Sequence, residues 1–165
     1  MEAVLRENQG ALLGYFQRRI PNSEDAAEAY GELLLTAWRI RRRMPKDPLH
    51  ARMWLYGVAR NIVRSEQRTL ARHSDAVKQL RAQASLDISA VPDGEHADLR
   101  DAIAALDEED AELIRLTYWD GLPSHEAAAI LGINPSTARS RLTRLKTALR
   151  AAVEESTAQI GERHV

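Results

Sequence analysis

The chain has 165 residues, a formal net charge of −1 and no cysteine, which allows one ordinary domain or two small ones and excludes disulfide scaffolds and cysteine-ligated zinc. Hydrophobic residues make up 44% of the sequence and aromatic residues only 5%, so a folded core is available, strand signals are weak and we expect an all-α protein. No apolar stretch approaches eighteen residues or follows a basic start, so we expect a cytoplasmic protein with no membrane association.

The charge is unevenly distributed along the chain. Residues 38–73 hold ten Lys or Arg and two acids, residues 85–112 hold one Arg and ten acids, and residues 115–150 hold six bases and two acids. The near-neutral total therefore hides two basic blocks that are candidates for nucleic-acid binding. The acidic stretch from Asp87 to Glu112 is either a solvated linker or a segment that folds over a basic face and masks it.

The N-terminal part of the chain shows helical periodicity over three segments. The first helix ends at Pro21, and its apolar stripe is formed by Leu5, Leu12, Leu13, Phe16 and Ile20. Asn22 or Ser23 can cap the second helix, which is predicted to end near Arg43. The third helix is predicted from about residue 50 to about residue 70.

After the third helix the periodicity weakens, and acidic residues and a turn signal replace it. A short amphipathic helix then begins near Leu99, and the next helix is predicted to start after an Asp107 N-cap and to stop at Gly121. We expect two small helical domains joined by a flexible linker. The expected parts are a domain at 1–73, an acidic linker at 74–98, a second domain at 99–153 and a polar tail at 154–165.

The strongest local pattern lies in the second of these domains. A helix expected from about Ser124 to Leu131 is followed by Gly132, which can adopt the positive φ of a tight turn. Asn134 is a favourable N-cap, and Pro135 suits the first position of the next helix. The pattern indicates a helix-turn-helix, a motif whose second helix enters the major groove of DNA.

The second helix of this motif is predicted to have one buried and one exposed face. Apolar residues at helical spacing define the buried face: Ala138, Leu142, Leu145 and Leu149. Polar and basic residues project away from the core: Ser136, Arg139, Ser140, Arg141, Thr143 and Arg144. We expect the N-terminal members to contact base edges and the later arginines, with Arg141 on the flank, to contact phosphates. A basic run alone is more often a solvated face, but the glycine turn, the Asn-Pro start and the absence of acids from this helix favour DNA contact.

A second candidate nucleic-acid surface lies in the first basic block. Arg60, Arg64 and Arg68 are spaced by four and share one helix face, and Asn61 beside them can hydrogen-bond a base. The spacing alone fits a solubilising stripe over a packed helix equally well.

Taken together and in order, these patterns resemble the sigma factors of the extracytoplasmic-function (ECF) group, the smallest members of the main bacterial sigma family. The resemblance covers about residues 10–150. It rests on Asp25-Ala26-Ala27-Glu28 with Glu32, Ala37-Trp38-Arg39, Trp54-Leu55 with Ala59-Arg60-Asn61, Asp120-Gly121-Leu122 and the helix-turn-helix. The most specific motif is Thr137-Ala138-Arg139-Ser140-Arg141-Leu142, which generic helix-turn-helix proteins rarely carry.

The resemblance implies a dissociable subunit that gives bacterial RNA polymerase its promoter specificity. In that family the first domain binds the clamp of the largest subunit and captures bases of the minus-ten strand, and the second docks on the flap and reads the minus-thirty-five duplex. The implied minus-ten residues are Arg60, Asn61, Arg64 and Arg68. The residues implied to bind core polymerase are Asp25, Glu28, Glu32, Trp38 and Arg39. Such proteins are usually held inactive by an anti-sigma factor, which is therefore an expected partner.

Three residues depart from the family pattern. Gly31 stands where Gln is frequent, Ser65 where Asp is frequent, and Pro123 where Ser often caps the first helix of the helix-turn-helix. Gly31 inside a helix costs about 1 kcal/mol relative to Ala and lacks the side chain for one expected polymerase contact. At Pro123, either the cap moves to Ser124 or the proline itself opens the helix.

Two other functions fit parts of the pattern. One is a stand-alone helix-turn-helix repressor or activator whose first block dimerises or binds a ligand. The other is an enzyme, but the sequence has no glycine-rich phosphate loop, no G-x-S-x-G and no H-E-x-x-H. We therefore expect no catalysis, no cofactor and no small-molecule substrate. No metal site is expected either, because metal-ligand spacing is absent among His50, His73, His96, His125 and His164.

Overall fold

The computed structural model describes the backbone of residues 1–84 and 97–162 and the side chains of residues 1–69, 99 and 101–154. Within these ranges the regular elements are helices, which confirms the predicted all-α class. They are α1 (Glu2–Gln17), α2 (Ser23–Arg39), η1 (Arg41–Arg43), α3 (Pro48–Ala84), α4 (Ala97–Ala104), α5 (Glu108–Ile114), η2 (Arg115–Trp119), α6 (Ser124–Leu131) and α7 (Pro135–Glu162). In the described part of the chain, no helix has the length and apolar character needed to cross a membrane.

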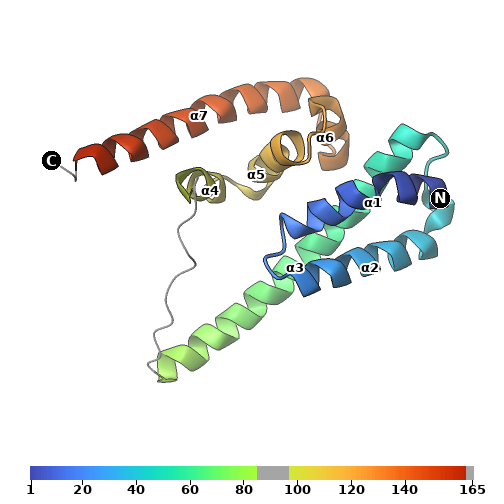
Figure 1. Cartoon of the computed structure of the whole chain (residues 1–165), viewed down its shortest axis with the longest axis horizontal. Coiled ribbons are helices and arrows are strands. Elements are labelled where there is room, and N and C mark those ends of the chain that lie inside the picture. The colour runs from blue at the N-terminus through green and yellow to red at the C-terminus, as the bar shows by residue number, and fades with distance from the viewer. Residues whose placement is uncertain (85–96, 163–165) are drawn as a thin grey trace. The chain divides into compact units, whose positions relative to one another are not determined.

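The chain divides into two compact units, Met1–Ser89 and Ala90–Val165. The first unit is a bundle in which α1, α2 and α3 each pack against the other two (Figure 1). Its centre is aromatic: the rings of Tyr15 and Tyr56 meet edge to face with centroids 5.5 Å apart, and Phe16 meets Tyr30 at 6.4 Å. Edge-to-face pairs of this kind add to the stabilisation from burial alone.

Capping residues account for the starts of α2 and α3. The side chain of Asn22 accepts the backbone N–H two residues on at 2.8 Å, so Asn22 is the cap of α2. The helix ends at Arg39, earlier than predicted, and the short 3₁₀ turn η1 follows. Pro48 is the first residue of α3, two residues before the predicted start, and Asp47 accepts the backbone N–H of His50 at 2.9 Å.

Two helices are longer than the apolar pattern predicted. The backbone of α3 stays helical to Ala84, beyond the expected end near residue 70, and that of α7 stays helical to Glu162, through the expected polar tail. Both extensions are rich in residues with high helix propensity, which can continue a helix without an apolar stripe. The turn expected at residues 92–94 lies outside the described residues, and the bounds of the domains, linker and tail stay predictions.

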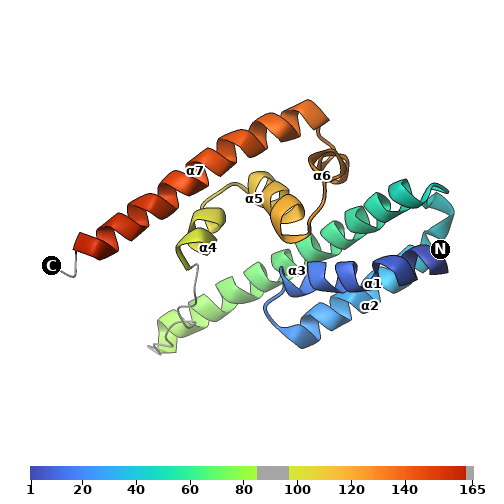
Figure 2. The same cartoon turned by 45° about the horizontal axis from the view of Figure 1, so that its top comes forward.

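The second unit packs α4, α5 and α6 against α7 (Figure 2). Asp107 caps α5 as predicted, since its side chain accepts the backbone N–H of Asp110 at 2.9 Å. After α5 the chain widens into the π-helical turn η2, in which the N–H of Asp120 donates to the carbonyl of Arg115 at 3.0 Å. Gly121 follows with φ +66°, a left-handed conformation that suits glycine and turns the chain toward α6.

Candidate nucleic-acid interface

The helix-turn-helix is formed by α6, the turn at Gly132 and the start of α7. The N–H of Ile133 donates to the carbonyl of Ala128 at 3.0 Å, and that of Gly132 to the carbonyl of Ala129 at 3.3 Å. These two bonds define a Schellman motif, which needs a left-handed residue after the helix. Gly132 supplies it with φ +72°, as predicted.

The second helix of the motif begins as the sequence indicates. The side chain of Asn134 accepts the backbone N–H of Ser136 at 2.9 Å and the Ser136 hydroxyl at 2.8 Å, and Pro135 is the first helical residue. The first helix begins at Ser124, with Pro123 at the N-cap position and no side-chain cap there. The proline therefore opens that helix, which is the second of the two predicted alternatives.

The exposed side of α7 carries the predicted minus-thirty-five residues. Ala138, Leu145 and Leu149 are buried, and Leu142 is half-buried, so the predicted inner face is confirmed. The residues that project to solvent are Ser136, Arg139, Ser140, Thr143 and Arg144, whereas Arg141 is only partly exposed on the flank. Hydroxyls of this helix bond to their own backbone: Ser140 donates to the Thr137 carbonyl at 3.0 Å and Thr143 to the Arg139 carbonyl at 3.0 Å.

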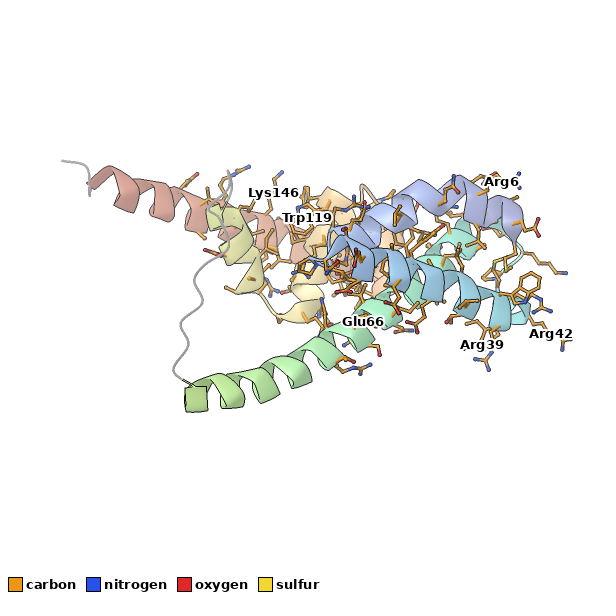
Figure 3. All side chains as sticks on the ribbon, turned by 60° about the horizontal axis from the view of Figure 1, so that its bottom comes forward. Arg6, Arg39, Arg42, Glu66, Trp119 and Lys146 are labelled. Carbon is orange, nitrogen blue, oxygen red and sulfur yellow. The ribbon has the colours of Figure 1, made fainter. Side chains whose placement is uncertain are left out.

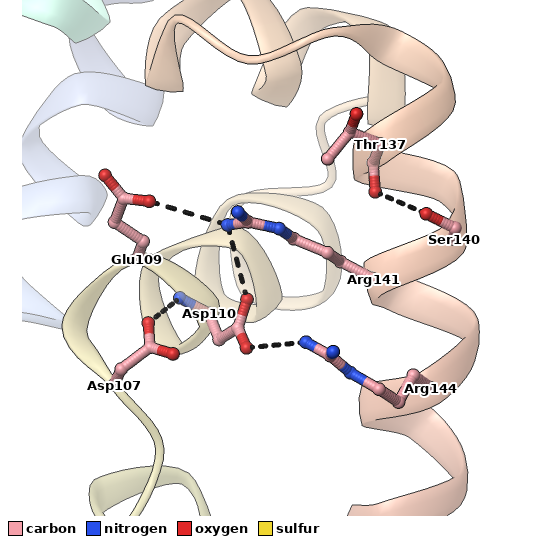
Figure 4. A network of polar contacts seen from close by, with 7 residues as sticks. All are labelled: Asp107, Glu109, Asp110, Thr137, Ser140, Arg141 and Arg144. Carbon is pink, nitrogen blue, oxygen red and sulfur yellow. Dashed lines mark hydrogen bonds and ion pairs between the residues drawn. The ribbon is translucent and has the colours of Figure 1, made fainter.

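Two of the predicted DNA-binding arginines are engaged by acids of α5 (Figure 4). Arg144 Nη2 donates to Asp110 Oδ2 at 3.2 Å, while Arg141 Nη1 lies 3.4 Å from Glu109 Oε2 and 3.6 Å from Asp110 Oδ1. We name these four residues the α5–α7 ion-pair cluster. Its acids belong to the acidic stretch that the sequence offered as linker or mask, and its arginines come from a helix more than thirty residues away in the sequence.

The predicted minus-ten residues all lie on α3 in the first unit. Asn61 and Arg68 are exposed, whereas Arg60 and Arg64 are half-buried. The opposite side of this helix packs into the bundle through residues that are buried: Leu55, Tyr56, Ala59, Ile62 and Val63. The four polar residues therefore lie on the side of α3 that is turned away from the bundle core.

The predicted polymerase-binding residues lie along one side of α2. The residues Asp25, Glu28, Glu32 and Arg39 are exposed at helical spacing, opposite the buried Ala26, Ala29, Leu33 and Ala37. On this side the sequence reasoning missed Leu35, which is 65% exposed, next to the predicted Trp38, which is 55% exposed. A signal was available, because three successive leucines at 33–35 cannot all face the core of a helix.

A cationic turn between α2 and α3 was also missing from the predicted sites. A hollow is lined there by Arg39, Ile40, Arg41, Arg42 and Arg43. The guanidinium of Arg41 stacks 4.5 Å from the Trp38 ring and donates to the Trp38 carbonyl at 2.9 Å. Figure 3 shows Arg39 and Arg42 extending from this end of the first unit. The run of four arginines in five residues was visible in the sequence as charge, without a role.

The second unit contains an apolar pocket of about 230 Å³ that the sequence did not predict. Its lining residues come from α4, α5, η2 and α7: Leu99, Ile103, Ile114, Tyr118, Trp119, Lys146 and Leu149. Tyr118 and Trp119 are partly exposed because the π-helical turn carries them out of the core. Among the described residues, no group of histidine, aspartate or glutamate side chains is arranged to hold a metal ion.

Comparison with known proteins identifies first the class of protein and then the family to which the chain belongs. The family model for sigma-70 region 4 matches residues 96–149, which contain α4 to most of α7 and thus the helix-turn-helix. The ECF RNA polymerase sigma factor SigL of Mycobacterium tuberculosis is 31% identical over 160 residues, covering 94% of this chain and 89% of that protein. The chain belongs to the ECF group of RNA polymerase sigma factors, as its sequence motifs indicated.

Solved structures share the fold at lower sequence identity. The sigma factor RpoE of Bartonella quintana, solved with the anti-sigma factor NepR, aligns over 93% of this chain and 98% of its own with a TM-score of 0.61 and 21% identity. CnrH, solved with the cytosolic domain of CnrY, aligns over 93% of this chain and 87% of its own with a TM-score of 0.63 and 21% identity. Both likenesses concern the fold.

Proposed function

We propose that this chain confers promoter specificity on bacterial RNA polymerase through two DNA-reading surfaces, one in each unit. The observation that carries the proposal is the exposed polar and basic side of α7. This helix is the second helix of the helix-turn-helix, and the chain belongs to the ECF sigma family. The polymerase and the chromosome are in the cytoplasm, so that is where we place the protein. Bond formation belongs to the polymerase, and this chain acts without catalysis of its own.

The minus-thirty-five element is read by the N-terminal part of α7. Ser136, Arg139 and Ser140 lie in its first two turns and are exposed, which suits contact with base edges in the major groove. Thr143 follows on the same side, and Arg141 and Arg144 lie on the flank, where phosphates of the duplex pass. Arg139 is the arginine of this set that lies in these first two turns, and a guanidinium can make a bidentate contact to a guanine.

The minus-ten element is read by α3 together with the cationic turn. Asn61 offers an amide for hydrogen bonds to a base, and Arg60, Arg64 and Arg68 supply positive charge along the same side of the helix. The arginines of the cationic turn, Arg41 to Arg43, add charge at the other end of the same unit. Together they suit a single strand, which exposes both its bases and its phosphates.

Core polymerase binds the exposed side of α2 and the apolar pocket of the second unit. The α2 surface joins acidic residues to the exposed apolar side chains Leu35 and Trp38, a mixture typical of protein interfaces. We assign this surface to the clamp. The pocket under Tyr118 and Trp119 is assigned to the flap, since an apolar side chain of a partner would fill it. An anti-sigma factor is a further proposed partner, in line with the complex in which RpoE was solved with the anti-sigma factor NepR.

Run-off transcription with sigma-free core polymerase tests the proposal. Core polymerase, the full-length protein and a library of genomic promoter fragments are combined, and transcripts are mapped to their start sites. We expect transcripts that start downstream of a shared pair of elements and that are absent when either protein is left out. A protein that binds a palindromic site as a dimer and never binds core polymerase would instead be a stand-alone regulator.

A matched pair of leucine variants tests the α2 surface separately from DNA. Leu35 and Leu49 are both exposed leucines of the first unit, but only Leu35 lies on the exposed side of α2. Leu35→Ser is expected to weaken binding to core polymerase by about 1–2 kcal/mol, and Leu49→Ser to leave it unchanged. Equal losses in the two variants, measured by fluorescence anisotropy with labelled protein, would remove α2 from the interface.

A further inference from the structure

Asp110 is a buried carboxylate at the start of α5. Its side chain is 9% exposed, and its backbone N–H donates to the capping side chain of Asp107. A charged group in this position requires partners, because burial of an unpaired carboxylate is costly. The cap fixes the backbone of Asp110 at the start of α5.

The partners of this carboxylate are two arginines that face DNA in the proposed function. Asp110 Oδ2 accepts from Arg144 at 3.2 Å, and Oδ1 lies 3.6 Å from Arg141, which also pairs with Glu109 at 3.4 Å (Figure 4). Arg141 and Arg144 are three residues apart and therefore neighbours on the flank of α7. Among the described residues, the α5–α7 ion-pair cluster is where acids contact cations of the proposed DNA-binding helix.

The geometry resembles the contact that the same arginines would make with DNA. Carboxylate and phosphate oxygens both accept hydrogen bonds from a guanidinium, and they compete for the same donors. Arg144 is 69% exposed while its carboxylate partner is nearly buried. A phosphate can therefore reach the Arg144 guanidinium from solvent and compete with Asp110 for it.

We propose that Glu109 and Asp110 are intramolecular competitors of the DNA backbone, which hold Arg141 and Arg144 in the free protein and must be displaced by phosphates on binding. This inference rests on the proposed contact between α7 and DNA. It gives the free chain weak affinity for duplex DNA of any sequence, since two of its cations are neutralised and the acids repel phosphates. It leaves Arg139, which is outside the cluster, available for reading bases.

The experiment compares two variants with the same change in charge. Glu109→Gln/Asp110→Asn removes the competing acids, and Asp101→Asn/Glu154→Gln removes two exposed acids elsewhere in the same unit. Full-length proteins are titrated against a fluorescein-labelled duplex of about 20 bp and mixed sequence, at several salt concentrations. We expect the first variant to bind about tenfold tighter than wild type and the control to gain no more than about twofold. The slope of log affinity against log salt should steepen by roughly 2 in the first variant only, because in the wild type the two displaced carboxylates take up cations and so offset part of the counterion release from the DNA.

Further variants keep the test decisive. Glu109→Gln alone changes a half-exposed side chain, so it should keep the fold, checked by thermal unfolding, and retain part of the gain. Arg141→Ala/Arg144→Ala should weaken DNA binding more when introduced into the acid-free Glu109→Gln/Asp110→Asn protein than when introduced into the wild type. Equal gains in the acid-free and control variants, or weaker binding without the acids, would overturn the inference. If Arg139→Ala, tested in the acid-free protein, also changes nothing, the contact between α7 and DNA has failed as well.

Discussion

Asp47 holds the start of α3 through two contacts with one residue. Its carboxylate accepts the backbone N–H of His50 at 2.9 Å, and the ring Nδ1 of His50 lies 2.6 Å from the same Oδ2. The backbone hydrogen bond from His50, followed by the contact with its ring, lowers the pKa of Asp47 below its ordinary value of 3.8. A single exposed side chain thus couples the start of the longest helix of the first unit to pH.

The substitution Asp47→Asn is expected to lower stability at neutral pH and to matter less in acid. The pKa of Asp47 is lower in the folded than in the unfolded chain, so its ionised form stabilises the protein above the unfolded value of 3.8. That contribution disappears as the pH falls through the folded-state pKa. The melting temperatures of wild type and variant should therefore converge as the pH is lowered from 7 to below 3.8 and through the lowered folded-state pKa.

His50→Ala provides the control for this prediction. It keeps the backbone N–H, which is the largest cause of the lowered pKa, and removes only the ring. We expect its melting temperature to stay closer to that of the wild type than the melting temperature of Asp47→Asn does. A difference between wild type and Asp47→Asn that does not change with pH would mean that the carboxylate is not the stabilising group.

At the scale of elements, the turn between α6 and α7 depends on the backbone of one residue. Gly132 has φ +72°, and a Cβ added there would meet no atom within 4 Å. A larger residue would therefore be disfavoured by backbone strain rather than by a clash. A Cβ added at Gly10, inside α1, would also meet open space, but the backbone there has an ordinary helical conformation.

Gly132→Ala is expected to reduce the free energy of unfolding by about 1–2 kcal/mol, and Gly10→Ala to raise it by up to about 1 kcal/mol. Urea unfolding of the full-length proteins measures both values. If Gly132→Ala and Gly10→Ala shift the free energy of unfolding in the same direction, the left-handed conformation is not the reason that position 132 needs glycine.

The elements that could be predicted from the sequence are those defined by local chemistry. The helix-turn-helix was predicted correctly from Gly132, Asn134 and Pro135, because a positive φ, a cap and a first-turn proline are properties of a few adjacent residues. The ends of α3 and α7 were predicted too early. The prediction ended each helix where its apolar stripe ends, but residues of high helix propensity continue the helix beyond that point. The end of α2 was predicted too late for a related reason, since charge and propensity continue through η1 while the helix does not.

Features formed between distant segments could not be predicted in this way. Glu109 and Asp110 were recognised only as part of an acidic stretch, and their pairing with Arg141 and Arg144 depends on how α5 packs against α7. The pocket beside Trp119 also follows from packing, which decides how the helices of the second unit enclose it. The assignments of individual residues to promoter and polymerase stay predictions.

For the whole molecule, the proposed function divides DNA recognition between two units that fold around separate cores. Asn61 belongs to the first unit and Arg139 to the second, and each is exposed. Changes at sites with no shared partner usually add in free energy. Recognition of the minus-ten element and recognition of the minus-thirty-five element should therefore be separable by mutation of the protein and of the promoter.

Arg139→Ala is expected to weaken initiation by about 1–3 kcal/mol, and Asn61→Ala to weaken it independently. Run-off assays on promoter variants measure this: base changes in the minus-thirty-five element should abolish the effect of Arg139→Ala and leave that of Asn61→Ala intact. The double variant should lose the sum of the two within about 0.5 kcal/mol. An Arg139→Ala variant that performs like wild type on every minus-thirty-five sequence would take Arg139 out of the interface.

The ion pairs of Asp110 also bear on how many copies of the protein a cell has available. A chromosome offers about 10⁶ or more sites for sequence-independent binding, so even weak affinity for arbitrary duplex retains most copies of a basic protein. If acids neutralise two cations of α7 in the free chain, the ratio of retained to free copies is roughly tenfold lower at a given salt concentration. The remaining copies stay free to diffuse and to bind core polymerase, the partner proposed for this protein. Two acids whose ion pairs resemble ordinary local packing would then set how much transcription this protein initiates.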